Sequence, residues 1–144
     1  DNFDHPELKS LKQFNDLIFK SKLGKEVIKL GQVDIDSLVG IYNLASVYIQ
    51  PSFYEGFGLP ILEAMNCGTP VLCSKGGSLQ EVGGAAVIYF DPNNLDQLVT
   101  LLADILSDKS LRNKLTGLGL YRAAKYSWEK TAKETIKVYE SLKV

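Results

Sequence analysis

The chain has 144 residues, of which 45% are hydrophobic and 23% are charged, and its formal net charge is −1. This length and composition are typical of one globular domain with a buried core. The nearly balanced charge excludes a general attraction to nucleic acid, and no apolar run approaches the roughly 18 residues of a membrane-spanning helix.

The cysteine and histidine content argues against metal and triad chemistry. Cys67 and Cys73 are the two cysteines, too few for a disulfide framework, and they fit a reducing compartment. His5 is the one histidine and stands near the N-terminus, so a zinc site and a Ser-His-Asp triad both lack their parts. No signal-peptide pattern is present at the start of the sequence. We therefore expect a cytoplasmic domain without a metal site.

Helical and extended patterns alternate along the chain. The predicted elements are, in order, a helix over 8–18, a strand over 27–30, a helix capped by Asp36 over 36–45, a strand over 47–49, a helix from Pro60 to Gly68, a strand over 70–73, a short helical piece over 79–82, a strand over 86–90, and helices over 95–106, 111–121 and 128–142. Ser127 is expected to cap the last helix. Short apolar strands that alternate with amphipathic helices predict an α/β fold with a parallel sheet.

In such sheets ligands bind at the carboxyl ends of the strands. This rule points to the segments after Leu30, Ile49, Cys73 and Phe90, and the loop over 51–60 carries the most unusual chemistry among them. The segment over 74–78 is expected to be a flexible turn.

The loop after the second predicted strand reads Glu55-Gly56-Phe57-Gly58-Leu59-Pro60. Its glycines let the backbone approach a ligand, and the helix that begins near Pro60 offers free N–H groups that suit a phosphate. Glu63 is expected in the first turn of that helix. Because a carboxylate accepts hydrogen bonds from hydroxyls, a phosphate and two glutamates together suggest a sugar nucleotide. The spacing alone leaves two interpretations about equally open: a phosphate ligand at the strand end, or an ordinary turn with a solvated Glu55 and a Glu63 that complements the helix dipole.

The segment over 52–65 resembles the signature of the retaining glycosyltransferases of the GT-B fold, family 4, also called glycosyl transferases group 1. It carries that family's pair of glutamates, Glu55 and Glu63, with seven residues between them. The segments over 30–33, 44–52, 66–71, 84–86, 90–92 and 126–129 are similar to the family as well. The resemblance covers roughly residues 25–142, and it implies a Rossmann-like sheet with flanking helices.

The resemblance also implies roles for individual residues. Glu55 is expected beside the donor sugar as the catalytic residue, and Glu63 is expected to bind the ribose hydroxyls. Gly56 and the backbone amides of 57–59 (Phe57, Gly58 and Leu59) are expected to approach the sugar and the diphosphate. The nucleobase is expected along 31–33, which are Gly31, Gln32 and Val33. The substrate is a nucleoside diphosphate sugar, and neither a cofactor nor a metal is expected.

The same resemblance implies that residues 1–144 are part of a larger enzyme. They correspond to a partial C-terminal nucleotide-sugar-binding domain whose last helices span 108–144. The family's N-terminal acceptor domain and its Gly-rich loop with an Arg and a Lys have no counterpart here, and two central strands are expected to be missing. The sheet is then either rearranged or completed by another chain. We expect this chain alone to be inactive and the intact enzyme to have, at most, peripheral contact with a membrane.

Two other functions remain open from the sequence. A nucleotide-binding module without transfer activity, acting as a regulator or subunit, would bind nucleotide but give no turnover with a separate N-terminal half. A flavodoxin-like domain with an unrelated ligand would show a phosphate loop after its first strand, and 31–34 make a poor one. The sugar, the base and the acceptor are not determined by the sequence.

Overall fold

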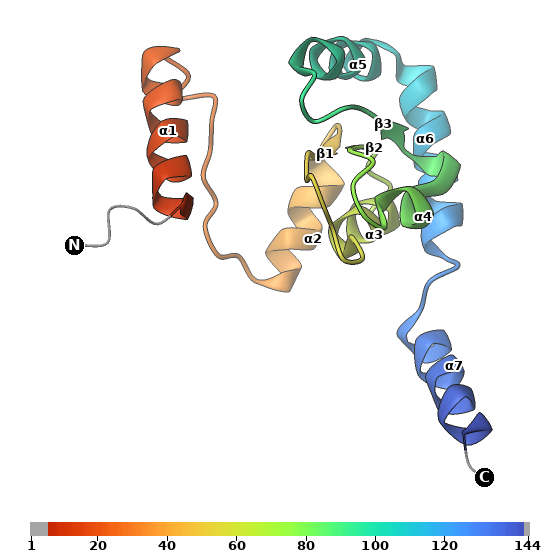
Figure 1. The fold of residues 1–144 in the computed structure, drawn as a ribbon. Coiled ribbons are helices and arrows are strands. Elements are labelled where there is room, and N and C mark those ends of the chain that lie inside the picture. Colours follow the sequence, from red (N-terminus) through yellow and green to blue (C-terminus); the bar gives the residue numbers. More distant parts are fainter. Residues whose placement is uncertain (1–5, 143–144) are drawn as a thin grey trace. The chain divides into compact units, whose positions relative to one another are not determined.

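A computed structural model describes residues 6–142, and the chain divides into two units between Asp34 and Ile35 (Figure 1). Helix α1 (Pro6–Lys20) belongs to the first unit. The second unit contains the helices α2 (Ile35–Leu44), α3 (Leu59–Asn66), α4 (Leu79–Gly83), α5 (Leu95–Ser107), α6 (Lys109–Ala123) and α7 (Trp128–Ser141), a 3₁₀ turn η1 (Gly84–Ala86), and the strands β1 (Tyr48–Gln50), β2 (Val71–Cys73) and β3 (Ile88–Tyr89).

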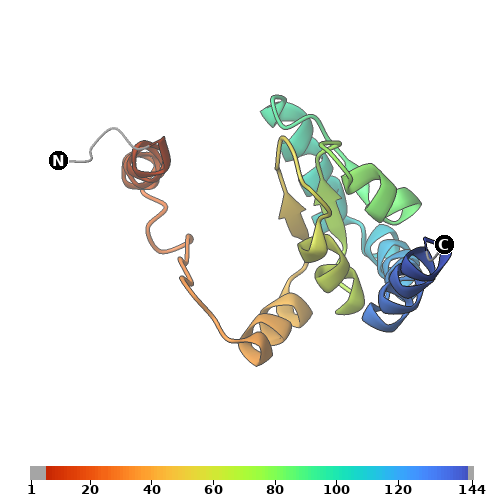
Figure 2. The ribbon, with the colours of Figure 1, turned by 60° about the horizontal axis from the view of Figure 1, so that its bottom comes forward.

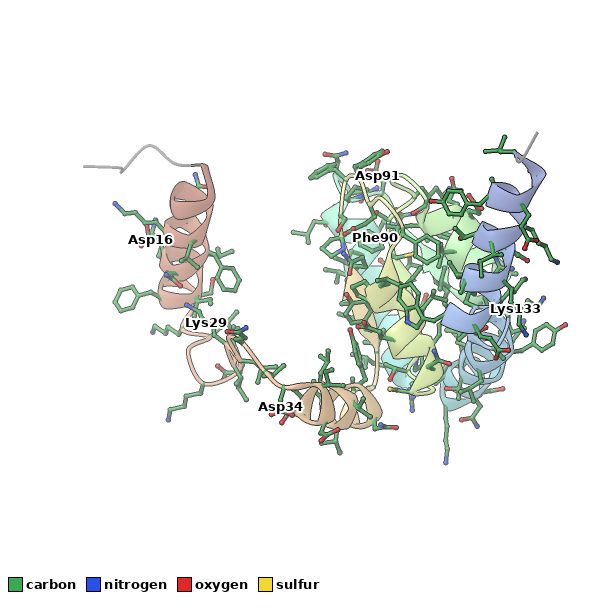
Figure 3. All side chains as sticks on the ribbon, turned by 90° about the horizontal axis from the view of Figure 1, so that it is seen from below. Asp16, Lys29, Asp34, Phe90, Asp91 and Lys133 are labelled. Atoms are coloured by element: carbon green, nitrogen blue, oxygen red, sulfur yellow. The ribbon has the colours of Figure 1, made fainter. Side chains whose placement is uncertain are left out.

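The strand predicted over 27–30 does not form, and that prediction was wrong. Residues 27–30 have neither helical nor strand structure. The Lys29 ammonium, labelled in Figure 3, instead donates a hydrogen bond to Asn15 on α1 and lies 5.5 Å from the centre of the Phe14 ring. A strand needs a neighbour to pair with, and residues 6–34 contain no second extended segment. The apolar pattern alone was therefore misleading.

The remaining three strands form one parallel sheet in the order β1-β2-β3 (Figure 2). Ile49 pairs with Leu72, and Leu72 pairs with Ile88. Two further backbone bonds continue the ladder past the strand ends, from Ser74 to Gln50 at 3.0 Å and from Phe90 to Cys73 at 3.1 Å. The predicted α/β class with a parallel sheet is thus confirmed, although η1 shortens the last strand predicted over 86–90.

Helices cover both faces of the sheet, since alternate residues of a strand point to opposite sides. On one face Leu72 packs with α5 and α6 in a cluster that contains Phe90, Ile105 and Leu115. On the other face Val71 and Cys73 pack with α2, α3 and α4 in a second cluster that contains Tyr42, Ile61, Leu62, Met65, Leu79 and Val82. The sheet lies between α5 and α3 in Figure 1. This arrangement leaves the loops at the carboxyl ends of the strands as the place where a ligand can reach the sheet.

Side chains cap the three helices that follow the sheet. Asn94 accepts a hydrogen bond from the Gln97 amide at the start of α5, and Asp108 accepts one from Leu111 at the start of α6. Ser127 accepts a bond from the Lys130 amide and caps α7, as the sequence predicts. Asp36, by contrast, lies inside the first turn of α2, which begins two residues earlier than a cap at that position would require. No helix within residues 6–142 combines the length and the apolar character needed to cross a membrane.

Cys73 should resist alkylation in the folded protein. Its side chain is fully buried at the end of β2, and burial raises the pKa of its thiol to about 12. The thiolate is the reactive form, so we expect iodoacetamide at neutral pH to leave Cys73 unmodified while the half-buried Cys67 serves as an internal reference. Peptide mass spectrometry reads out both sites. Both cysteines should react in denaturant, and fast native labelling of Cys73 would contradict its buried position.

Candidate functional site

The loops after β1, β2 and β3 meet at one edge of the sheet because all three strands are parallel. The loop after β1 runs from Pro51 to Gly58 and leads into α3, and the loop after β2 spans 74–78. These two loops pack directly on each other. The Ser78 amide donates to the Glu55 carbonyl at 3.2 Å, and the Ser78 hydroxyl donates to the Phe57 carbonyl at 2.7 Å. The Ser74 hydroxyl also donates to the Ser52 carbonyl.

Two glycines allow this close packing. A Cβ atom on Gly76 would overlap the Phe53 carbonyl, and one on Gly77 would overlap the Glu55 carbonyl. Gly77 also has a φ of +60°, in the left-handed region that side chains rarely adopt. The turn that the sequence predicts as flexible is therefore a packed support for the loop that carries Glu55.

Gly77→Ala should destabilise this support. We expect the free energy of unfolding to fall by at least about 1–3 kcal/mol, the usual cost of a left-handed non-glycine residue, because the methyl group also overlaps the Glu55 carbonyl. Urea unfolding followed by circular dichroism measures the change. Gly117→Ala is the matched control: Gly117 lies inside α6 with open space around it, and its replacement should stabilise the helix by about 0.5–1 kcal/mol. Equal stabilities of the two variants would contradict the packing described.

Glu55 is held by a chain of hydrogen bonds that all point toward its carboxylate. The Tyr48 hydroxyl donates to the side-chain oxygen Oε1 of Gln50. The Gln50 side-chain Nε2 donates to the Ser52 hydroxyl at 2.6 Å and to Glu55 Oε1 at 2.7 Å. The Ser52 hydroxyl donates to the same Oε1 at 2.6 Å. Oε1 thus accepts two bonds, and among the described residues Oε2 accepts none, which leaves one carboxylate oxygen available to a ligand.

The start of α3 has the form expected for a ligand-binding helix end. Gly58 precedes the helix with a φ of 91° and provides no side-chain cap, and Pro60 stands within the first two helical positions. The backbone N–H groups of this first turn are therefore not satisfied by a capping side chain. Gly68 ends the helix with a φ of 74°, as predicted. The Phe57 ring packs edge-on against the Tyr126 ring, with the ring centres 6.1 Å apart, and this contact anchors the loop to the segment after α6.

Glu63 lies on the same helix as this N-terminus, but in its second turn. The first turn contains no acidic residue, so the expected placement of Glu63 in that turn was wrong by about one position. Glu63 is exposed, and its Oε2 accepts a hydrogen bond from the Tyr42 hydroxyl at 3.2 Å. Burial raises the pKa of the Tyr42 hydroxyl, and the charges of neighbouring Tyr48 and Glu63 raise it further. Tyr42 therefore remains a neutral hydrogen-bond donor over the whole physiological range.

The two glutamates are linked through a pair of tyrosines. The rings of Tyr42 and Tyr48 pack edge to face, with centres 5.5 Å apart. Burial raises the pKa of Tyr48 to about 12, and the carboxylates of Glu63 and Glu55 contribute to the shift. Tyr42 supports Glu63 and Tyr48 supports Glu55 through Gln50. The ring contact thus connects the hydrogen-bonded supports of the two carboxylates.

The supporting residues Tyr42, Tyr48, Gln50 and Ser52 were not predicted from the sequence. A signal for three of them was present: Tyr48, Gln50 and Ser52 alternate along an extended segment, so their side chains are expected on the same side. Tyr42 carried no such signal, because its contact with Glu63 joins α2 to α3 across 21 positions of the sequence.

The residues predicted to hold the nucleobase lie in the other unit. Gly31, Gln32 and Val33 follow α1, in the unit that ends at Asp34, and Gly31 has a φ of +64° with open space around its Cα. Gly56 and Leu59 lie with Glu55 in the loop after β1 and at the start of α3. Among residues 6–142 no group of three or more His, Cys, Asp or Glu side chains is placed to hold a metal ion, and His5 lies outside the described residues.

Comparison with known proteins identifies the class. Residues 7–117 match the family of the glycosyl transferases group 1, and the chain belongs to this family. It is similar to O-antigen chain mannosyltransferase B of Escherichia coli, with 46% identity over 113 residues that make up 78% of this chain and 30% of that protein. It also resembles a D-inositol 3-phosphate glycosyltransferase of Corynebacterium urealyticum, with 38% identity over 74% of this chain and 26% of that protein.

Solved structures show the same fold. Sucrose-phosphate synthase from Thermosynechococcus elongatus matches with a TM-score of 0.83 and 32% identity, over 91% of this chain and 34% of that one. The C-terminal domain of a glycosyl transferase group 1 family protein from Francisella tularensis matches with a TM-score of 0.73 and 26% identity, over 84% of this chain and 64% of that one. The chain therefore has part of a GT-B fold and spans about a third or less of the length of the curated relatives named above.

Proposed function

We propose that this chain is the donor-binding part of a retaining glycosyltransferase that moves a hexose from a nucleoside diphosphate sugar to a glycan or a lipid-linked acceptor. The observation that carries the proposal is the pair of supported carboxylates, Glu55 and Glu63, on one loop and helix at the carboxyl end of β1. The similarity to an O-antigen chain mannosyltransferase favours mannose as the hexose and a polysaccharide as the product.

Glu55 is the residue we place beside the donor sugar. Two hydrogen bonds fix its Oε1, so its Oε2 can face the reacting sugar in one defined orientation. Positive charge develops at the anomeric carbon as the diphosphate leaves, and a fixed carboxylate stabilises that charge without having to reorganise. The packed loop over 74–78 supports the same function, because it holds the backbone on either side of Glu55.

Glu63 and the start of α3 are suited to the nucleotide part of the donor. A carboxylate accepts hydrogen bonds, and vicinal ribose hydroxyls donate two. Tyr42 occupies Glu63 Oε2 and orients the group. The amides of Phe57, Gly58 and Leu59 lie at or just before the positive end of the helix dipole, where a diphosphate is stabilised. That Gly31, Gln32 and Val33 hold the nucleobase stays a prediction from the resemblance, since these residues belong to the other unit.

The intact enzyme needs more than this chain. A leaving diphosphate requires positive charge, and the loop between β1 and α3 contains no Lys or Arg. We propose that an Arg and a Lys outside this chain supply it, and that an N-terminal domain binds the acceptor and excludes water when the two domains close. This chain alone would then bind the donor without transferring the sugar.

Calorimetric titration of the chain with UDP, GDP and ADP in turn tests the proposal. We expect one nucleoside diphosphate to bind saturably and thereby to identify the base. Absence of binding by any of the three to the folded chain, and again after the preceding part of the domain is restored, would show that the ligand class is wrong. Binding in the restored protein alone would show that the charged loop outside this chain is essential.

A further inference from the structure

A cavity lies at the carboxyl edge of the sheet, beyond β2 and β3. It is an open cavity of about 380 Å³ whose lining includes Phe53, Lys75, Tyr89, Asp91, Pro92 and Gln97. This volume is near the lower end of the range of about 300–1,000 Å³ for small-molecule sites. Neither Glu55 nor Glu63 lines it. We propose that this cavity binds one neutral pyranose unit of the acceptor glycan, in addition to the part of the acceptor held by the N-terminal domain, an inference that rests on the proposed function.

The polar groups in the cavity are fixed and still have bonding capacity. The Asp91 amide donates to Gln97 Oε1 at 2.8 Å, and Asp91 Oδ1 accepts bonds from Asn93 at 2.9 and 3.1 Å. Gln97 is also tied to the cap of α5, because its own amide donates to Asn94. Within the described part of the chain, Asp91 Oδ2 and Gln97 Nε2 have no partner. A sugar hydroxyl can donate to the first and accept from the second.

The apolar groups provide a surface for a sugar ring. Phe53 is 69% exposed, although it stands in the packed loop after β1, and so its ring is available to a ligand. Phe90, labelled with Asp91 in Figure 3, is 2% exposed and belongs to the core beneath the cavity. The Tyr89 hydroxyl is already engaged, since it donates to the Gly84 carbonyl at 2.9 Å. Tyr89 therefore forms part of the cavity wall, while Phe53 provides the exposed aromatic surface.

The charges in the cavity favour a neutral ligand over an anion. Lys75 brings one positive charge and Asp91 one negative charge, and no other charged residue among 6–142 lines the cavity. An anion such as phosphate would be attracted by Lys75 but repelled by Asp91. A hexopyranose carries both donors and acceptors on an apolar ring, and it matches this combination of an aromatic surface, an amide and a carboxylate.

Amide chemical-shift titration of the ¹⁵N-labelled chain tests this inference. The probes are methyl α-D-mannopyranoside and methyl α-D-glucopyranoside up to tens of millimolar, with inorganic phosphate as the anionic comparison. We expect saturable shifts at Lys75, Gly76 and Gln97 with at least one glycoside, and none there with phosphate. Phe53→Ala should weaken the binding about tenfold. Gln97→Glu, which keeps the oxygen that bonds the Asp91 amide but removes the free donor, should weaken it as well.

Tyr121→Ala is the control, since Tyr121 is an aromatic residue of α6 that is 67% exposed and outside the cavity. This variant should bind the glycoside like the unaltered chain. No saturable shift, shifts that neither Phe53→Ala nor Gln97→Glu reduces, or equal shifts with phosphate would overturn the inference. The nucleoside diphosphate titration separates the two proposals: nucleotide binding without glycoside binding would refute this cavity alone, whereas absence of both, also in the protein with the preceding part of the domain restored, would refute the proposed function too.

Discussion

Glu55→Gln should reduce glycosyl transfer by at least about a hundredfold in a full-length enzyme that contains this chain, while the affinity for the nucleoside diphosphate stays unchanged. The substitution keeps the size of the side chain and an oxygen that can accept from Gln50 and Ser52, so the hydrogen-bonded support survives. What it removes is the negative charge proposed to stabilise the anomeric centre. Initial rates of sugar transfer and calorimetry on the same protein measure the two effects.

Two other variants test whether the effect belongs to Glu55. Glu81→Gln changes an exposed glutamate on α4 and should leave transfer unchanged. Ser52→Ala removes one of the two donors to Glu55 Oε1 and should cost less than Glu55→Gln, about tenfold, because Gln50 still holds the carboxylate. If Glu55→Gln retained most of the transfer rate, or if it weakened nucleotide binding as much as transfer, the role proposed for Glu55 would be wrong.

Glu63→Ala is expected to weaken nucleoside diphosphate binding by about 1–3 kcal/mol, the usual cost of leaving polar partners unpaired. The substitution removes the carboxylate proposed for the ribose hydroxyls and leaves the Tyr42 hydroxyl without its acceptor. Calorimetry gives the change in dissociation constant directly. The unaltered chain should bind a 2′,3′-dideoxy nucleotide more weakly than the normal nucleotide, by the same amount of about 1–3 kcal/mol. The Glu63→Ala variant should bind the two nucleotides equally. If the Glu63→Ala variant lost further affinity with the dideoxy nucleotide, a hydrogen bond between Glu63 and the ribose would be contradicted.

The elements that were predicted correctly from the sequence are those governed by local patterns. Strand β1 forms where the short apolar run predicts it. Helix α3 forms where Pro60 and Gly68 predict its two ends. The stop at Gly68 and the cap at Ser127 likewise depend on residues next to the helix end. Such local patterns span only a few consecutive residues, and so they can be recognised without knowledge of the fold.

The features that were missed depend on contacts between distant segments. Residues 27–30 have the composition of a strand, but a strand is stabilised by its neighbour, and none is present in residues 6–34. Gly76 and Gly77 look like a flexible turn, yet they are needed because the backbone of another loop lies against them. In the site, the family signature marks Glu55 and Glu63, whereas Tyr42 becomes visible as a partner of Glu63 only when α2 and α3 are packed together.

The central claim, that the donor nucleotide binds at the loop and helix over 55–63, is tested most directly by mapping amide shifts in the ¹⁵N-labelled chain during titration with UDP, GDP and ADP. We expect one nucleotide to produce saturable shifts that are largest at Phe57, Gly58, Leu59 and Glu63. Largest shifts elsewhere, for example along α7, would contradict the claim. So would the absence of any shift over 55–63 in a protein to which the preceding part of the domain has been restored.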